Sequence, residues 1–240
     1  MYDLYWLGIS QDNKEYKKNA NYLLNTLWFN KGWVRDKQMQ DLCMSSMFIQ
    51  MACYGHVENL KIYEIVDYLL EQQYKDGGWN CSWQLVHKHS SLHTTLTTLE
   101  AFKEYLDNDY TYRKNEILEA IPKGEEFILR KEFFKSEITK EVINQQFTRF
   151  PFPFSWHYDI VRAMNYFRKT NRPYDIRMES VLQKLIKTNK NGYFRSYSRF
   201  QGLIHFSMED EKLGSRWNTL RALSVLKEYM RAEFLNIIHS

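Results

Sequence analysis

The sequence predicts an all-α protein. Its 240 residues include only four prolines, so long stretches of the chain are free to form helices. Apolar residues recur at helical spacing along most of it; Leu92, Leu96 and Leu99, for example, fall on one face of a helix over 90–106. The ranges expected to be helical on this spacing are 14–28, 39–54, 58–73, 90–106, 113–131, 155–169, 175–188 and 215–235.

Local signals indicate where one helix begins and where a single hairpin lies. Ser90 or Ser91 is suited to cap the helix over 90–106, because a serine hydroxyl accepts the free N–H groups of a first turn. Strand signals are rare, and the strongest, over 192–206, is entered through Asn191-Gly192, a pair suited to a tight turn. We therefore expect helices with at most one short β-hairpin near 192–206.

The chain also repeats itself. Residues 22–33, YLLNTLWFNKGW, match residues 68–79, YLLEQQYKDGGW, without a gap, and a weaker copy occupies 182–193. Each copy predicts a helix that ends in a glycine turn followed by an aromatic residue. In the second copy the turn and its aromatic are Asp76-Gly77-Gly78-Trp79, with Cys81 two residues further on.

A second repeat follows those turns. Residues 90–105 align with 214–229, so that Ser91 matches Ser215 and Thr95 matches Thr219. The ranges 154–167 and 39–54 align more loosely, with Ser155 placed opposite Ser91 and Asp41 opposite His93. About four helix pairs result, and repeated helix pairs stack because no single pair can bury its own apolar faces.

Composition excludes several classes of protein. The net charge of +4 is spread along the chain, which argues against nucleic-acid binding. Three widely spaced cysteines do not form a disulfide framework and favour a reducing compartment. The first ten residues lack the features of a signal peptide, and the longest uncharged stretch, 42–57, is too short to span a membrane. We expect a soluble, cytoplasmic protein.

The segment from Gln72 to Trp79 resembles the glutamine–tryptophan repeat of squalene–hopene cyclases and protein prenyltransferase β subunits. The wider chain resembles an uncharacterised bacterial group of squalene-cyclase-like proteins, through the stretches YKDGGWNC, HSSLHTTLTTLEAF, FTRFPFPFSWHYDIVRAMNYF, IHFSMED and SRWNTLRALSVLK. The resemblance implies one α/α-toroid domain over 1–240, complete or partial, in which inner helices surround an aromatic-rich cavity. The chain departs from the family because it lacks both Asp-rich motifs, Asp-x-Asp-Asp and Asp-Asp-x-x-Asp, so full triterpene cyclisation is not expected.

In a toroid the helices of the second repeat would be the inner ones. The polar and aromatic side chains near their N-terminal ends would then lie together at one rim of the cavity. The alignment predicts one ring of Asp41, His93, His157 and Trp217, and a second ring of Cys43, Thr95, Asp159 and Thr219. Three interpretations stay open for these side chains. They are acid–base catalysis by His157 with Asp159 or His93, a zinc site of Cys81, Cys43 and Asp41, and inert polar groups that cap and cross-link helices.

The function implied by the resemblance is binding of a small apolar or isoprenoid-like ligand, with or without catalysis. Its cavity would be lined by Trp79, Trp83, Trp156, Tyr158, Trp217, Arg216 and Glu209, although core packing of the aromatic rings is the alternative. A non-catalytic ligand- or protein-binding scaffold is the rival function. A carbohydrate-active enzyme would need paired carboxylates, and the candidate pairs are Asp159 with Glu209 or Asp159 with Asp41. Zinc is the one candidate cofactor, and a homodimer is one way to close the ring.

Overall fold

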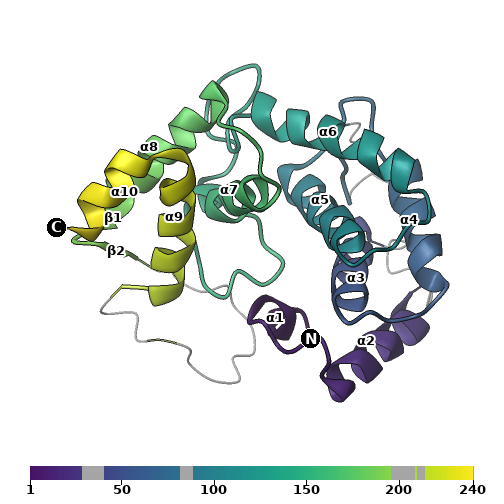
Figure 1. Ribbon diagram of the computed structural model, residues 1–240. Coiled ribbons are helices and arrows are strands. Elements are labelled where there is room, and N and C mark those ends of the chain that lie inside the picture. Colours follow the sequence, from purple (N-terminus) through teal and green to yellow (C-terminus); the bar gives the residue numbers. More distant parts are fainter. Residues whose placement is uncertain (29–40, 82–88, 196–208, 210–213, 240) are drawn as a thin grey trace. The chain divides into compact units, whose positions relative to one another are not determined.

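The computed structural model describes residues 1–28, 41–81, 89–195, 209 and 214–239. This part of the chain is mostly helical, as predicted (Figure 1), and forms two compact units, Met1–Ile128 and Leu129–Ser240. The single domain over 1–240 and its toroidal closure stay predictions. Nowhere in the described ranges is there a helix with the length and apolar character needed to cross a membrane.

The first unit is built around two central helices that lie side by side, α3 (Leu42–Tyr54) and α5 (Leu92–Asp107) (Figure 1). Small hydroxyl residues let them approach closely, since Ser46 Oγ and Thr98 Oγ1 share a hydrogen bond of 3.1 Å. The helices α2 (Lys14–Leu27) and α4 (Lys61–Glu71) pack on α3. The unit also contains α1 (Tyr2–Trp6) and most of α6 (Lys114–Arg130).

The second unit is organised around α9 (Arg216–Tyr229), which packs against α7 (Ile160–Lys169). Its other elements are α8 (Glu179–Thr188), α10 (Arg231–Ile238), the 3₁₀ helices η1 (Gln145–Thr148) and η2 (Ile176–Met178), and the strands β1 (Asn189–Lys190) and β2 (Tyr193–Phe194). The two strands pair antiparallel and turn at Asn191 and Gly192, both with positive φ. The hairpin thus uses the expected turn, although most of 192–206 lies outside the described residues.

The predicted helices agree with the structure to within a few residues at most ends, except where a start was placed too early. The range 155–169 begins as a helix only at Ile160, because Asp159 is its cap. The range 215–235 is two helices, separated at Met230, whose φ of −141° is not helical. The short α1 and η1 were not predicted, since five or fewer residues carry too little periodicity to detect, whereas η2 falls within the predicted helical range 175–188.

The N-terminal caps of α3 and α7 correct the repeat alignment that the sequence predicted for these two helices. The side chains of Asp41, Ser91, Asp159 and Ser215 each accept a hydrogen bond from a backbone N–H in the first turn of α3, α5, α7 and α9. Asp41 therefore corresponds to Ser91 and not to His93, and Asp159 replaces Ser155 in that position. The two predicted rings are wrong in this respect: Cys43, His93 and Trp217 share the second position of their helices.

The strongest repeat in the structure is a pair of backbone contacts made by a buried aromatic residue. Trp79 N donates to Thr95 Oγ1 at 3.0 Å, and Trp79 O accepts from Ser91 N at 2.8 Å. Phe194 makes the same two contacts in the second unit, with Thr219 Oγ1 at 3.0 Å and Ser215 N at 2.9 Å. We call each such arrangement the aromatic clamp. The matches Ser91–Ser215 and Thr95–Thr219 are thereby confirmed, and Phe194, not Tyr193, corresponds to Trp79.

Three contacts hold the loop of the first clamp in place. Asp76 accepts from Gly78 N at 3.3 Å and from Ser90 N at 3.0 Å. The Trp79 side chain is fully buried and its Nε1 donates to Leu69 O at 2.7 Å. Gly77 has a φ of +97°, and a Cβ there would overlap the backbone carbonyl of Lys123. The glycine turn after α4 is therefore confirmed as the element that brings this loop against α5 and α6.

This geometry predicts different costs for two glycine-to-alanine changes. Gly8 also has a positive φ, of +75°, but an added Cβ would meet nothing within 4 Å. Gly8→Ala should therefore lower the free energy of unfolding by about 1 kcal/mol through backbone strain alone. Gly77→Ala adds the overlap with Lys123 and should cost about 3 kcal/mol. Urea unfolding measures both, and equal losses would show that the close approach to α6 does not matter.

Candidate metal centre

Three predicted metal ligands come together in the first unit. Asp41 and Cys43 lie at the start of α3, and Cys81 lies on the loop two residues beyond Trp79. One carboxylate oxygen of Asp41 and the two sulfurs all lie within 4.8 Å of one another. All three residues are half-buried.

The N-terminus of α3 orients this group. Asp41 Oδ1 accepts from the backbone N–H of Cys43 at 2.8 Å and of Met44 at 3.1 Å, which makes Asp41 the cap of the helix. Cys81 Sγ lies 3.1 Å from the same oxygen and 3.1 Å from Cys43 N. The first backbone N–H groups of α3 thus point at the Asp41 carboxylate and at Cys81 Sγ.

Thr94, in the first turn of α5, links both cysteines to a third element. Its hydroxyl lies 3.4 Å from Cys43 Sγ and 3.4 Å from Cys81 Sγ, and it accepts from Cys81 N at 3.2 Å. Ser91 Oγ in turn donates to Thr94 Oγ1 at 2.9 Å. Thr94 was not predicted to lie beside the sulfurs; its position one turn from the Ser91 cap was the available signal.

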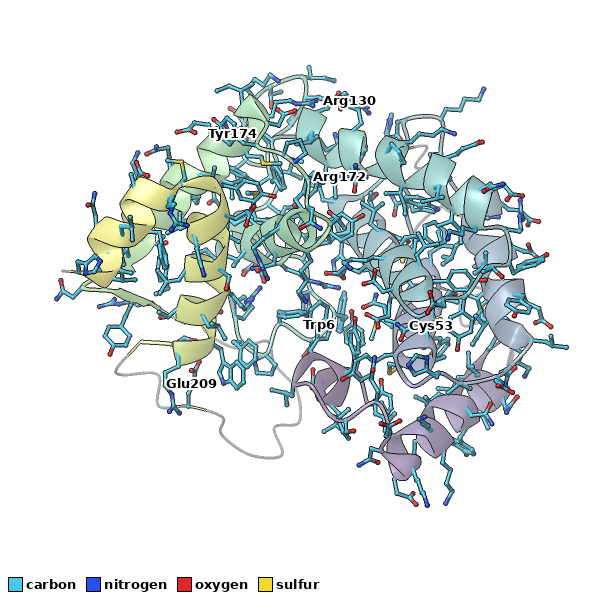
Figure 2. All side chains as sticks on the ribbon, viewed as in Figure 1. Trp6, Cys53, Arg130, Arg172, Tyr174 and Glu209 are labelled. Carbon is cyan, nitrogen blue, oxygen red and sulfur yellow. The ribbon has the colours of Figure 1, made fainter. Side chains whose placement is uncertain are left out.

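The two cysteines are joined by a hydrogen bond between their sulfurs. Cys43 Sγ and Cys81 Sγ lie 2.7 Å apart, with the Cys81 thiol as donor. The pKa of Cys81 is raised well above its usual value, first by this hydrogen bond, then by burial and by the charges of Cys43 and Asp41. Burial also raises the pKa of Cys53, which is fully enclosed on α3, where Figure 2 labels it. Cys53 is therefore an inert core thiol, whereas the other two form a pair.

The residues predicted for acid–base catalysis lie in different units. His93 is on α5 in the first unit, while His157 and Asp159 precede α7 in the second. Their grouping therefore stays a prediction. The pKa of His157 is lowered, first by burial and then by the charge of Arg162, so its imidazole is neutral at pH 7. The His157 ring stacks on Trp156 with their centroids 3.9 Å apart.

Asp159 is occupied by structural contacts. Its Oδ1 accepts from Arg162 N at 2.8 Å, which caps α7, and Arg221 Nη2 donates to both carboxylate oxygens at 3.0 and 2.8 Å. The Arg221 and Arg162 guanidinium groups both lie over the Phe154 ring, at 4.8 and 5.0 Å from its centroid. These contacts favour the interpretation of Asp159 as a residue that caps α7 and cross-links it to α9.

The predicted cavity residues are distributed over both units. Trp79 is fully buried in the first unit, with its ring 5.9 Å from that of Phe102, which favours core packing. In the second unit Trp217 stacks on Phe152, with ring centroids 4.9 Å apart, and Tyr158 donates to Phe133 O. The remaining members are exposed Trp156, exposed Arg216 and buried Glu209, whose carboxylate accepts from Arg216 N near the start of α9 (Figure 2). Trp83 lies outside the described residues, and the common cavity stays a prediction.

Comparison of the chain with protein-family models, with curated proteins and with solved structures gave no match. The resemblance to squalene-cyclase-like proteins and prenyltransferases therefore stays a prediction.

The contacts of Asp159 predict that its removal costs stability. Its side chain is 1% exposed and that of Arg221 13%, so Asp159→Asn would leave a partly buried guanidinium without its countercharge. We expect the free energy of unfolding to fall by about 2–4 kcal/mol. Asp175 is a matched control, because it caps η2 and pairs with Arg177 while 29% exposed; Asp175→Asn should cost about 1 kcal/mol or less. A stable Asp159→Asn protein in urea unfolding would instead favour a catalytic role.

Proposed function

We propose that the first unit binds a zinc ion through the Asp41 carboxylate and the Cys43 and Cys81 thiolates. The observation that carries the proposal is the convergence of these three ligand atoms within 4.8 Å from two separate segments of the chain. Thiolates select soft or borderline metals, and a carboxylate beside two thiolates belongs to the ligand sets of zinc. A clustered acidic surface would not provide this combination.

The positions of the sulfurs are compatible with the ion after a small adjustment. Two sulfurs bound at about 2.3 Å to one tetrahedral zinc lie about 3.8 Å apart. Cys43 Sγ and Cys81 Sγ are 2.7 Å apart, so side-chain rotation must separate them by about 1 Å. Thr94 donates to Cys81 Sγ, and the first N–H groups of α3 donate to Cys81 Sγ and to Asp41 Oδ1; these contacts fix the orientation of both ligands, as outer-shell partners of metal ligands do.

Charge also supports this assignment. The hydrogen bond to Cys43, then burial and the charges of Cys43 and Asp41, raise the pKa of Cys81 and keep it protonated when no cation is near; with both thiols ionised, three negative charges would lie within 4.8 Å. A divalent cation offsets two of those charges, and the N-terminus of α3 stabilises the remainder. Binding therefore has to displace the thiol protons.

Three ligands from the described residues would leave one tetrahedral position for water or a substrate atom. Catalytic zinc sites have this composition, whereas structural sites supply four protein ligands. Zinc would there supply Lewis-acid chemistry. Asp41 would keep its hydrogen bonds to the backbone of α3 while it binds the ion, so the helix cap and the metal ligand are one residue.

The apolar or isoprenoid-like ligand expected from the family resemblance remains a separate proposal. Its assigned residues lie in both units, and those of its aromatic members that the structure describes pack in cores or on neighbouring rings. Lipid that co-purifies with the full chain, identified by mass spectrometry, would support it. A non-catalytic binding scaffold is the alternative, and the zinc proposal is compatible with both.

Metal analysis of the purified protein tests the zinc proposal. The full chain should bind one equivalent of zinc, and Asp41→Asn, Cys43→Ser and Cys81→Ser should each weaken its affinity by at least about 100-fold, because loss of a ligand exceeds the usual cost of losing an outer-shell partner. At a free zinc concentration about 100 times its dissociation constant, the wild-type protein should gain about 2.7 kcal/mol of stability.

Cys53→Ala serves as the control for loss of a thiol. Cys53 is fully buried on α3, outside the metal-binding group, so its replacement should leave the stoichiometry at one while lowering stability. Absence of stoichiometric metal from a protein purified without chelators, together with no zinc-dependent stabilisation, would reject the proposal. Unchanged affinity in all three ligand variants would show that the metal is held elsewhere.

A further inference from the structure

We propose that Cys43 and Cys81 form a reversible disulfide, which makes the metal centre a thiol redox switch. The release of metal on oxidation rests on the proposed zinc site, but the bond between the two sulfurs does not. The closest pair of sulfurs among the described residues thus has two alternative states, one bridged by a cation and one bonded directly.

The distance between the sulfurs lies between the values for these two states. A disulfide bond is about 2.05 Å long, and two sulfurs on one zinc are about 3.8 Å apart. Cys43 Sγ and Cys81 Sγ are 2.7 Å apart, so the bond requires an approach of less than about 1 Å. The same small scale of movement in the opposite direction admits the metal.

The segments that carry the sulfurs are fixed independently. Cys43 belongs to the first turn of α3, which the Asp41 cap holds, and Cys81 follows the aromatic clamp on α5. Thr94 contacts both sulfurs from α5. The pair is therefore held together in the reduced protein by the fold, and oxidation does not have to bring distant segments together.

Access separates this pair from the third cysteine. Cys43 and Cys81 are half-buried, whereas Cys53 is fully enclosed. Susceptibility to oxidation follows exposure and thiolate character, and a reactive cysteine with a neighbouring thiol resolves to a disulfide. The expected product is one intramolecular bond, with Cys53 left as a thiol.

The oxidant we infer is a peroxide. The Cys43 thiolate attacks one peroxide oxygen; an S–O bond forms, the O–O bond breaks, and the leaving hydroxide takes up the proton lost by Cys43 to become water. Cys81 then attacks the sulfur of the Cys43 sulfenic acid; the S–S bond forms, the S–O bond breaks, and the second hydroxide leaves as water with the Cys81 proton. Two thiols and one hydrogen peroxide give one disulfide and two water molecules, and a dithiol reductant reverses the reaction.

The two states exclude each other because a metal needs both thiolates and a disulfide has none. Oxidation of the zinc-loaded protein should therefore release the ion in proportion to disulfide formed. Reduction should restore two thiols and the capacity to bind one equivalent of zinc.

The test treats the full chain, both zinc-loaded and metal-free, with hydrogen peroxide, and then alkylates the remaining thiols. Mass spectrometry of unreduced peptides should show a cross-link between the Cys43 and Cys81 peptides, with one of the three cysteines alkylated; dithiothreitol should restore all three. A colorimetric chelator should detect zinc release in step with the cross-link. Cys53→Ala should behave like the wild-type protein, whereas Cys43→Ser and Cys81→Ser should form no intramolecular bond.

Two results would overturn the proposal: sulfinic acid on either cysteine without a cross-linked peptide, or a cross-link that involves Cys53. The outcomes also separate the two proposals made for this site. A Cys43–Cys81 cross-link in a protein that never binds zinc would reject the metal centre and leave the disulfide standing. Stoichiometric zinc in a protein that forms no cross-link would do the reverse.

Discussion

The aromatic clamp determines where the loop after α4 runs, and the candidate site depends on that loop. Trp79 is held through both of its backbone polar groups by Ser91 and Thr95, at the start of the central helix α5. Two residues later the chain reaches Cys81, which therefore lies beside Thr94 on the same helix turn. Because α3 packs along α5, its first turn, with Asp41 and Cys43, comes to the same place.

The helices were predictable because their apolar spacing is local information. The caps were harder, because serine and aspartate both suit the position and nothing in the repeat alignment distinguishes Ser155 from Asp159. The structure decides in favour of Asp159, whose carboxylate accepts from Arg162 N in the first turn of α7 and also pairs with Arg221, distant in sequence. For the same reason the repeat alignment was wrong by one residue in its third copy, where it paired Tyr193 with Trp79. Only tertiary contacts show that Phe194 and not Tyr193 is buried.

The metal ligands could be selected by residue type but not by spacing. Asp41, Cys43 and Cys81 were predicted together because cysteine and aspartate suit zinc and because each adjoins the start of a central helix. No short-range motif joins them: Cys43 and Cys81 are 38 residues apart, and the packing of α3 on α5 alone makes them neighbours. The acid–base group of His93, His157 and Asp159 rested on the same argument, but its members divide between two units. The contacts of Asp159 now favour a structural role.

The most direct test of this account is zinc K-edge X-ray absorption of the zinc-loaded full chain. The account predicts two sulfur ligands at about 2.3 Å and oxygen at about 2.0–2.2 Å, with one sulfur lost in Cys81→Ser and the oxygen shell changed in Asp41→Asn. A spectrum with nitrogen and oxygen ligands only, or one that Cys81→Ser leaves unchanged, would contradict it, because the metal would then be bound away from the cysteine pair that the aromatic clamp positions.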